Sequence, residues 1–494
     1  MQSNVSKKPI VRDFALFLID LLGTVLFWGG FYRAQFGADT LFREMLPMSD
    51  IGSSMDQQRY AAYYLAKWLL DIGIQITDHY RAFFFIYLLS IAADIWLIQK
   101  LFLPLLKDRE SVVTAGFLAA ASLAFLNVLF SETFMFPEFH ITYTCAYLLA
   151  TVGVFFYARK RLLFPTLCIL IACLFYQSAV IYAAMLYTGW LVISEEFVLS
   201  GKLVRRVLVG NMVFLLIGVL DYASSGFVKY IGLLEPEAES KTVVFEGMDT
   251  IRYIAEETIL LFKNSLNLLP SLWLPLAASL LAAVLTFLSL SRKKGGVRPV
   301  TLILLILAEA LLFLSIPLLS ASMYPRITFV FYTWQALLLI GALCVTEKAW
   351  IRRTFAVMCI LYLLVHAFFS QLIIGNRYLS NQLDIVYAEA VLREAAHYEE
   401  KTGIKITRIA IANDAYAPNS YDAVRFKRDQ INERLLSVSP FVLLEHLNGP
   451  GMQLTHIPMD RKIFEEHFGD RDWDRFDPEE QLWFDGDTLY WCVF

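Results

Sequence analysis

The sequence predicts a polytopic, all-α membrane protein that carries a small α/β domain at its C-terminal end. Of its 494 residues, 57% are hydrophobic and 18% are charged, whereas soluble globular chains have about 45–50% apolar and about 25% charged residues. The apolar residues gather in blocks of about twenty, the length that a helix needs to cross the hydrocarbon core of a bilayer. The net charge of −4 indicates no particular partner. Nucleic acid is disfavoured, because no basic stripe with interleaved aromatic residues occurs.

The chain begins like a signal peptide, with Lys7, Lys8 and Arg12 ahead of an apolar run. No small-residue cleavage site follows Phe31, so we expect an uncleaved first helix. The eleven apolar runs that we predict as crossings are Phe14–Phe31, Ala82–Leu103, Val112–Phe130, Thr142–Tyr157, Leu162–Phe175, Ala179–Ile193, Val207–Leu220, Leu269–Leu290, Val300–Leu319, Ile327–Val345 and Phe355–Ile374. The fifth and sixth runs are short, and a re-entrant pair over 162–193 is the alternative for them.

Positive charge alternates along the links between these runs and predicts their orientation. With the N-terminus in the cytoplasm, every short inner link carries at least three Lys or Arg, as the positive-inside rule requires. Those residues are Lys100, Lys107 and Arg109; Arg159, Lys160 and Arg161; Lys202, Arg205 and Arg206; Arg292, Lys293, Lys294 and Arg298; and Lys348, Arg352 and Arg353. An odd number of crossings places the C-terminal segment outside the cell.

Two outer links are long, 32–81 and 221–268. Each contains an amphipathic stretch, Gln57–Leu70 in the first and Thr250–Leu266 in the second. We expect these stretches to form helices that lie in the headgroup region. Disordered connectors are the alternative that their aromatic and amphipathic content disfavours.

The chain therefore divides into a multi-pass domain over 1–375 and a soluble extracytoplasmic domain over 376–494. In the tail, Leu383–Lys401 predicts a helix that Gly403 ends, and Lys405–Ala412 predicts a strand. Five of the six cysteines lie in apolar runs and none forms a CxxC pair, which favours buried thiols over disulfides or a metal site.

The polar residues of the outer links include carboxylates and isolated arginines. Asp50 and Asp56 are candidate general bases, while Arg59 and Arg326 are candidate anion-binding groups, since a guanidinium matches the oxygens of phosphate. The competing interpretations are a surface ion pair for Asp56 and Arg59, and an interfacial anchor for Arg326.

Three further outer residues, Glu132, Glu138 and His140, form a loose acid/base set whose spacing only weakly suggests a metal. Tyr176 and Gln177 interrupt an apolar hairpin, where the amide must find a hydrogen-bond partner.

Within the predicted crossings stand three carboxyl side chains, Asp20, Asp94 and Glu309. Ionisable residues at such depth are functional candidates, for example in proton relays. Hydrogen bonding between helices is the structural alternative.

The sequence resembles the GtrII-type membrane glucosyltransferases of the GT-C class. The motifs that carry the resemblance are the acidic first outer link, Phe175-Tyr176-Gln177-Ser178, Tyr324-Pro325-Arg326, and the closing Gly486-Asp487-Thr488-Leu489-Tyr490. In that family the aspartates of the first outer link are adjacent, whereas Asp50 and Asp56 are separated here, so the resemblance leaves open which one is catalytic.

The resemblance implies a GT-C-like fold and a bacterial plasma-membrane enzyme that transfers a hexose, with glucose expected, from a polyprenyl-phosphate donor to a surface glycan. Asp50 or Asp56 would deprotonate the acceptor, and Arg59 and Arg326 would hold the lipid phosphate without a required metal. The sugar and acceptor pocket would be lined by Glu132, Glu138, His140, Tyr176, Gln177 and Tyr324. The alternatives are a flippase for lipid-linked sugars, whose expected inverted repeats are not evident, and a glycan polymerase or ligase.

Overall fold

The computed structural model describes residues 8–33, 37, 40, 59–107, 109–230, 247–293, 297–320, 322–414, 419–426, 428, 431–448, 454–469, 471, 473 and 475–494. The chain divides into two compact units. The first consists of Met1–Tyr32 with Ile51–Leu372, and the second of Arg33–Asp50 with Ile373–Phe494.

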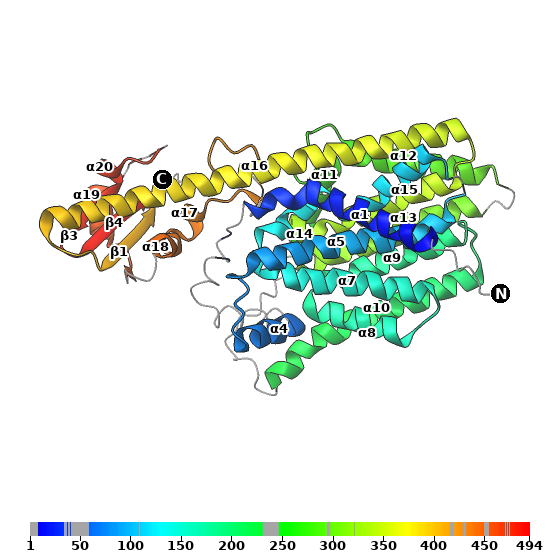
Figure 1. Ribbon diagram of the computed structural model, residues 1–494, viewed down its shortest axis with the longest axis horizontal. Coiled ribbons are helices and arrows are strands. Elements are labelled where there is room, and N and C mark those ends of the chain that lie inside the picture. Colours follow the sequence, from blue (N-terminus) through cyan, green and yellow to red (C-terminus); the bar gives the residue numbers. More distant parts are fainter. Residues whose placement is uncertain are drawn as a thin grey trace. The chain divides into compact units, whose positions relative to one another are not determined.

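The first unit is a bundle of long apolar helices (Figure 1). Its helices are α1 (Lys8–Trp28), α4 (Tyr60–Asp71), α5 (Tyr80–Phe102), α6 (Ser111–Ser122), α7 (His140–Ala158), α8 (Leu163–Phe175), α9 (Ser178–Ser194), α10 (Gly201–Tyr230), α11 (Met248–Asn264), α12 (Leu274–Ser291), α13 (Arg298–Ser320), α14 (Pro325–Thr328), α15 (Val330–Val345) and the first part of α16 (Ala349–Thr402). Short 3-10 turns, η1 (Gly29–Tyr32), η2 (Leu103–Leu105), η3 (Val128–Met135) and η4 (Pro137–Phe139), join some of them.

Each of the eleven apolar runs falls largely on a helix of this bundle. Eight helical segments in the described part of the chain are long and apolar enough to cross a membrane, which bears out a mostly helical membrane protein. The helices of the third, fifth and sixth runs, α6, α8 and α9, are shorter, at 12, 13 and 17 residues. The count of eleven crossings therefore stays a prediction.

The third run, expected to be helical through Phe130, is α-helical only to Ser122. Asn127 accepts a hydrogen bond from the amide of Phe130 at 3.1 Å and donates its own amide to the Leu123 carbonyl at 3.0 Å. Side-chain bonds of this kind compete with the helix for backbone groups. The chain continues as the wholly buried η3, which carries Glu132 into the bundle.

Links that the charge pattern assigns to one side meet in the fold. At the end assigned to the cytoplasm, Glu196 lies 2.7 Å from Lys107 and within 4.0 Å of Lys293 and Arg298. Arg353 likewise pairs with Glu110 at 2.7 Å. These residues come from four links that the charge pattern assigns to the same side of the membrane. Their contacts agree with that assignment. Which end faces the cytoplasm stays a prediction.

Both amphipathic stretches of the outer links form helices, α4 and α11. In Figure 1, α4 lies at one end of the bundle. The hydroxyl of Ser224 in α10 donates to the Tyr60 hydroxyl at 3.1 Å, so the two long outer links also meet.

The second unit contains a four-stranded sheet of β1 (Arg408–Asn413), β2 (Thr455–Ile457), β3 (Leu482–Asp485) and β4 (Thr488–Val493) in the order β2-β1-β4-β3. The central strand β1 is parallel to β2 and β4, whereas β3 is antiparallel to β4. Short helices accompany the sheet: α17 (Leu435–Val438), α18 (Pro440–Asn448), α19 (Arg461–His467) and α20 (Pro478–Gln481).

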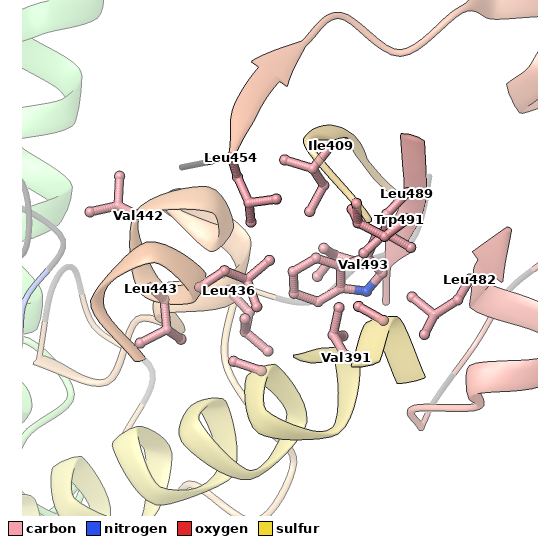
Figure 2. Close-up of a cluster of buried hydrophobic side chains, with 14 of the residues drawn as sticks. Val391, Ile409, Leu436, Val442, Leu443, Leu454, Leu482, Leu489, Trp491 and Val493 are labelled. Atoms are coloured by element: carbon pink, nitrogen blue, oxygen red, sulfur yellow. The ribbon is translucent and has the colours of Figure 1, made fainter. Parts of the chain in front are cut away.

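One face of this sheet packs on the C-terminal part of α16 and on α17 and α18. Figure 2 shows Val391, Ile409, Leu436 and Trp491 gathered in this core. The predicted helix end is found, since α16 stops at Thr402 and Gly403 has a φ of +73°. The helix was expected to begin at Leu383, but it continues unbroken from Ala349, because no proline interrupts the polar stretch after the last crossing.

Candidate functional site

The predicted bases Asp50 and Asp56 lie outside the described residues. Their neighbour Arg59 is described and stands directly before α4. The site is therefore built from Arg59 and the other outer groups.

Glu132 and Arg326 form a two-point ion pair across 194 positions of sequence. One carboxylate oxygen of Glu132 accepts from the Arg326 backbone amide at 2.7 Å, and the other accepts from its guanidinium at 2.8 Å. The Glu132 side chain is fully buried and that of Arg326 is 19% exposed. Charge-assisted bonds of this kind hold a guanidinium in a defined orientation. Glu132 is thus the counter-ion of Arg326.

Both candidate arginines lie over aromatic rings. The Arg326 guanidinium is 4.5 Å from the centroid of the Tyr324 ring and 4.9 Å from that of Phe136. The Arg59 guanidinium is 4.8 Å from the Tyr176 ring and 5.2 Å from the Phe139 ring. Such contacts with ring faces stabilise and orient a guanidinium, the planar cation that matches the oxygens of phosphate.

Tyr143 and Tyr176 connect the two arginines. Their rings meet edge to face with centroids 5.2 Å apart. Tyr143 lies within electrostatic range of Arg59, Glu132 and Arg326, and Tyr176 within range of Arg326. Tyr176 reaches this position because it has an extended backbone, with φ −158° and ψ 117°, between α8 and α9. The sequence motifs of three outer links therefore converge on one cluster of cations and tyrosines.

Gln177 finds its partner in the carboxyl group of Asp221, near the end of α10. Tyr60 lies beside the same carboxyl: partial burial raises the pKa of Tyr60, and the negative charge of Asp221 adds to the rise.

The sequence interpretation missed both Tyr143 and Asp221. Tyr143 was hidden in an apolar run, and Asp221 marked only the boundary of an outer link.

Glu138 and His140 are buried beside this cluster, each with 2% exposure. The His140 ring stacks on Tyr87 at 5.0 Å and touches the rings of Phe84 and Phe134. Across the described segments, no three His, Cys, Asp or Glu side chains converge as metal ligands would. Glu132, Glu138 and His140 thus form no metal-ligand set.

The three carboxyl groups inside the crossings are also buried. Asp20 accepts a hydrogen bond from Gln99 at 2.8 Å, and Asp94 has Thr151 as a partner. Neither carboxyl oxygen of Glu309 has a hydrogen-bond partner within the described structure, and its exposure is 1%. Asp20 and Asp94 thus bond between helices, whereas Glu309 stands alone.

No family model, no curated protein and no solved structure matches this chain. The resemblance to GtrII-type glucosyltransferases accordingly stays a prediction. The chemistry that the cluster allows is recognition of an anion: two guanidiniums oriented by aromatic rings, with hydroxyl groups beside them, suit the oxygens of a phosphate.

Proposed function

We propose that the protein is a membrane glycosyltransferase that moves a hexose, with glucose expected, from a polyprenyl-phosphate donor to a surface glycan outside the cell. The observation that carries the proposal is the convergence of Arg59 and Arg326 at one end of an apolar bundle. A lipid-linked sugar phosphate is anionic at its head and apolar along its tail, so it needs a cationic site of this kind beside lipid.

Different contacts hold the two arginines in the structure. Glu132 neutralises much of the charge of Arg326 and fixes its orientation. Arg59 is held by ring contacts with Phe139 and Tyr176. We propose that both arginines bind the donor phosphate, Arg326 in the orientation that Glu132 fixes.

The test is mass spectrometry of surface glycans from cells of the organism that makes the protein, compared with the same cells lacking it. The proposal predicts that a hexose substituent disappears when the protein is removed and returns when it is restored. Identical glycans in both strains would contradict it.

A flippase for lipid-linked sugars is the second candidate, and the partnerless carboxyl of Glu309 favours it. It predicts that translocation of a fluorescent lipid-linked sugar in proteoliposomes collapses in a Glu309→Gln variant, with no sugar transfer by the wild type. Translocation that persists in the Glu309→Gln variant would exclude this role for the carboxyl group.

A further inference from the structure

Asp221 is linked to the cationic cluster through Gln177 and Tyr60, from a helix that the sequence motifs do not include. It lies within α10 and is 4% exposed. Its Oδ1 atom has no hydrogen-bond partner within the described structure. Burying a carboxylate oxygen without a partner is costly. Asp20 Oδ2 and Asp94 Oδ1 share this feature, so what distinguishes Asp221 is its connection to Arg59.

The neighbours of Asp221 tie it to the cluster step by step. Its carboxyl accepts from the Gln177 side chain, and Gln177 follows Tyr176, whose ring lies under the Arg59 guanidinium at 4.8 Å. On the other side, Ser224, three residues further along α10, bonds the hydroxyl of Tyr60, which directly follows Arg59. Asp221 is thus connected to the arginine through both neighbouring elements.

We propose that Asp221 accepts the proton of the acceptor hydroxyl during hexose transfer, the role that the sequence assigns to Asp50 or Asp56. The proposal rests on the proposed function. A general base needs a carboxylate oxygen with a free lone pair and a second contact that orients it. Oδ1 supplies the lone pair and Gln177 the orientation.

The step balances as follows. The acceptor oxygen forms a bond to the anomeric carbon of the hexose, and its proton passes to Asp221. The bond between the anomeric carbon and the phosphate oxygen breaks, and its electron pair leaves with the polyprenyl phosphate, which Arg59 binds.

The test compares Asp221→Asn with wild type in membranes from source cells that lack the native protein. The rate measured is transfer of radiolabelled glucose from a synthetic polyprenyl-phosphate donor to endogenous glycan. Asparagine keeps the size of the side chain and a hydrogen bond to Gln177, but it cannot take a proton. We expect a fall of at least about 100-fold, the lower range for loss of a general base. Asp249→Asn, which alters an exposed carboxylate in the same outer link, should retain the wild-type rate.

A second measurement separates catalysis from folding. Native mass spectrometry of the purified protein should show undecaprenyl phosphate bound equally by wild type and Asp221→Asn, and Asp221→Glu should recover part of the transfer rate. Transfer by Asp221→Asn within about tenfold of wild type, or a loss of binding together with transfer, would overturn the assignment. Absence of transfer by the wild type itself would instead overturn the proposed function, and the role of Asp221 with it.

Discussion

The two ends of the helix bundle both carry ion pairs, but they hold their charges in opposite ways. At the end assigned to the cytoplasm, Glu196 is 46% exposed, and the side chains of its partners Lys107, Lys293 and Arg298 are 60%, 13% and 21% exposed. At the other end, Glu132 is fully buried against Arg326. The ends thus differ in their carboxylates, since Glu196 stays in contact with water and Glu132 does not. Cations in a dry cluster of rings must be oriented and compensated, which is what a binding site requires.

The largest expected difference between the ends is in stability. Glu132→Gln keeps the shape of the side chain but leaves the buried Arg326 without its counter-charge, which should cost about 3–5 kcal/mol. Glu196→Gln at the exposed end should cost about 0–1 kcal/mol. Thermal unfolding of both variants in detergent measures the difference. Equal loss of stability in the two variants would refute the contrast.

The next difference is in ligand binding. Arg59→Ala removes at least one charge-assisted hydrogen bond to a phosphate, worth about 1.5–3 kcal/mol, so binding of undecaprenyl phosphate should weaken by at least about 10- to 150-fold. The matched control is Arg161→Ala at the cytoplasmic end, where the guanidinium also lies over a ring, that of Phe156 at 5.5 Å. Native mass spectrometry gives both affinities. If Arg161→Ala weakened binding as much as Arg59→Ala, the assignment of the phosphate site to the Arg59 end of the bundle would be contradicted.

The smallest effect is expected at an exposed pair in the second unit, where Arg408 and Thr407 bond Asp487 and lower its pKa to about 2. Because the folded-state pKa lies below the unfolded value of about 3.9, the stabilisation is present above that value and is lost as the pH falls through about 2. Asp487→Asn should therefore lower the Tm at neutral pH by no more than a few degrees, roughly the scale of an exposed pair.

Thermal unfolding, monitored by near-ultraviolet circular dichroism at neutral pH and near pH 2, checks this prediction. Near the lower pH, wild type and Asp487→Asn should unfold together. A difference that persists there would assign the effect to packing and not to the charge of Asp487.

The helices could be predicted from the sequence because an apolar run and a terminating glycine such as Gly403 are local signals. Neither signal requires knowledge of how distant segments pack. The early end of α6 was not predicted, since the hydropathy of 112–130 hides the bonds that Asn127 makes with Leu123 and Phe130. Charge counting assigned links to sides, and the contacts of Glu196 agree with that assignment.

The arrangement of the site was beyond sequence reasoning, because it depends on packing between distant segments. Glu132 was expected in an acid/base set, yet it pairs with Arg326, and no local pattern relates the two. Asp221 reaches Gln177 only because α10 packs against α8 and α9. Four residues of the cluster could be predicted from their positions in the outer links alone, without knowledge of the fold: Arg59, Tyr176, Tyr324 and Arg326.

The central claim is that the arginine cluster faces the outside of the cell. Cysteine accessibility in intact cells tests it directly, because all six native cysteines are buried or half-buried. Met248, 76% exposed at the start of α11, belongs to an outer link, and Arg161 belongs to an inner one. A membrane-impermeant maleimide should label Met248→Cys in intact cells and Arg161→Cys only after permeabilisation. Labelling of Arg161→Cys but not Met248→Cys in intact cells would contradict the account.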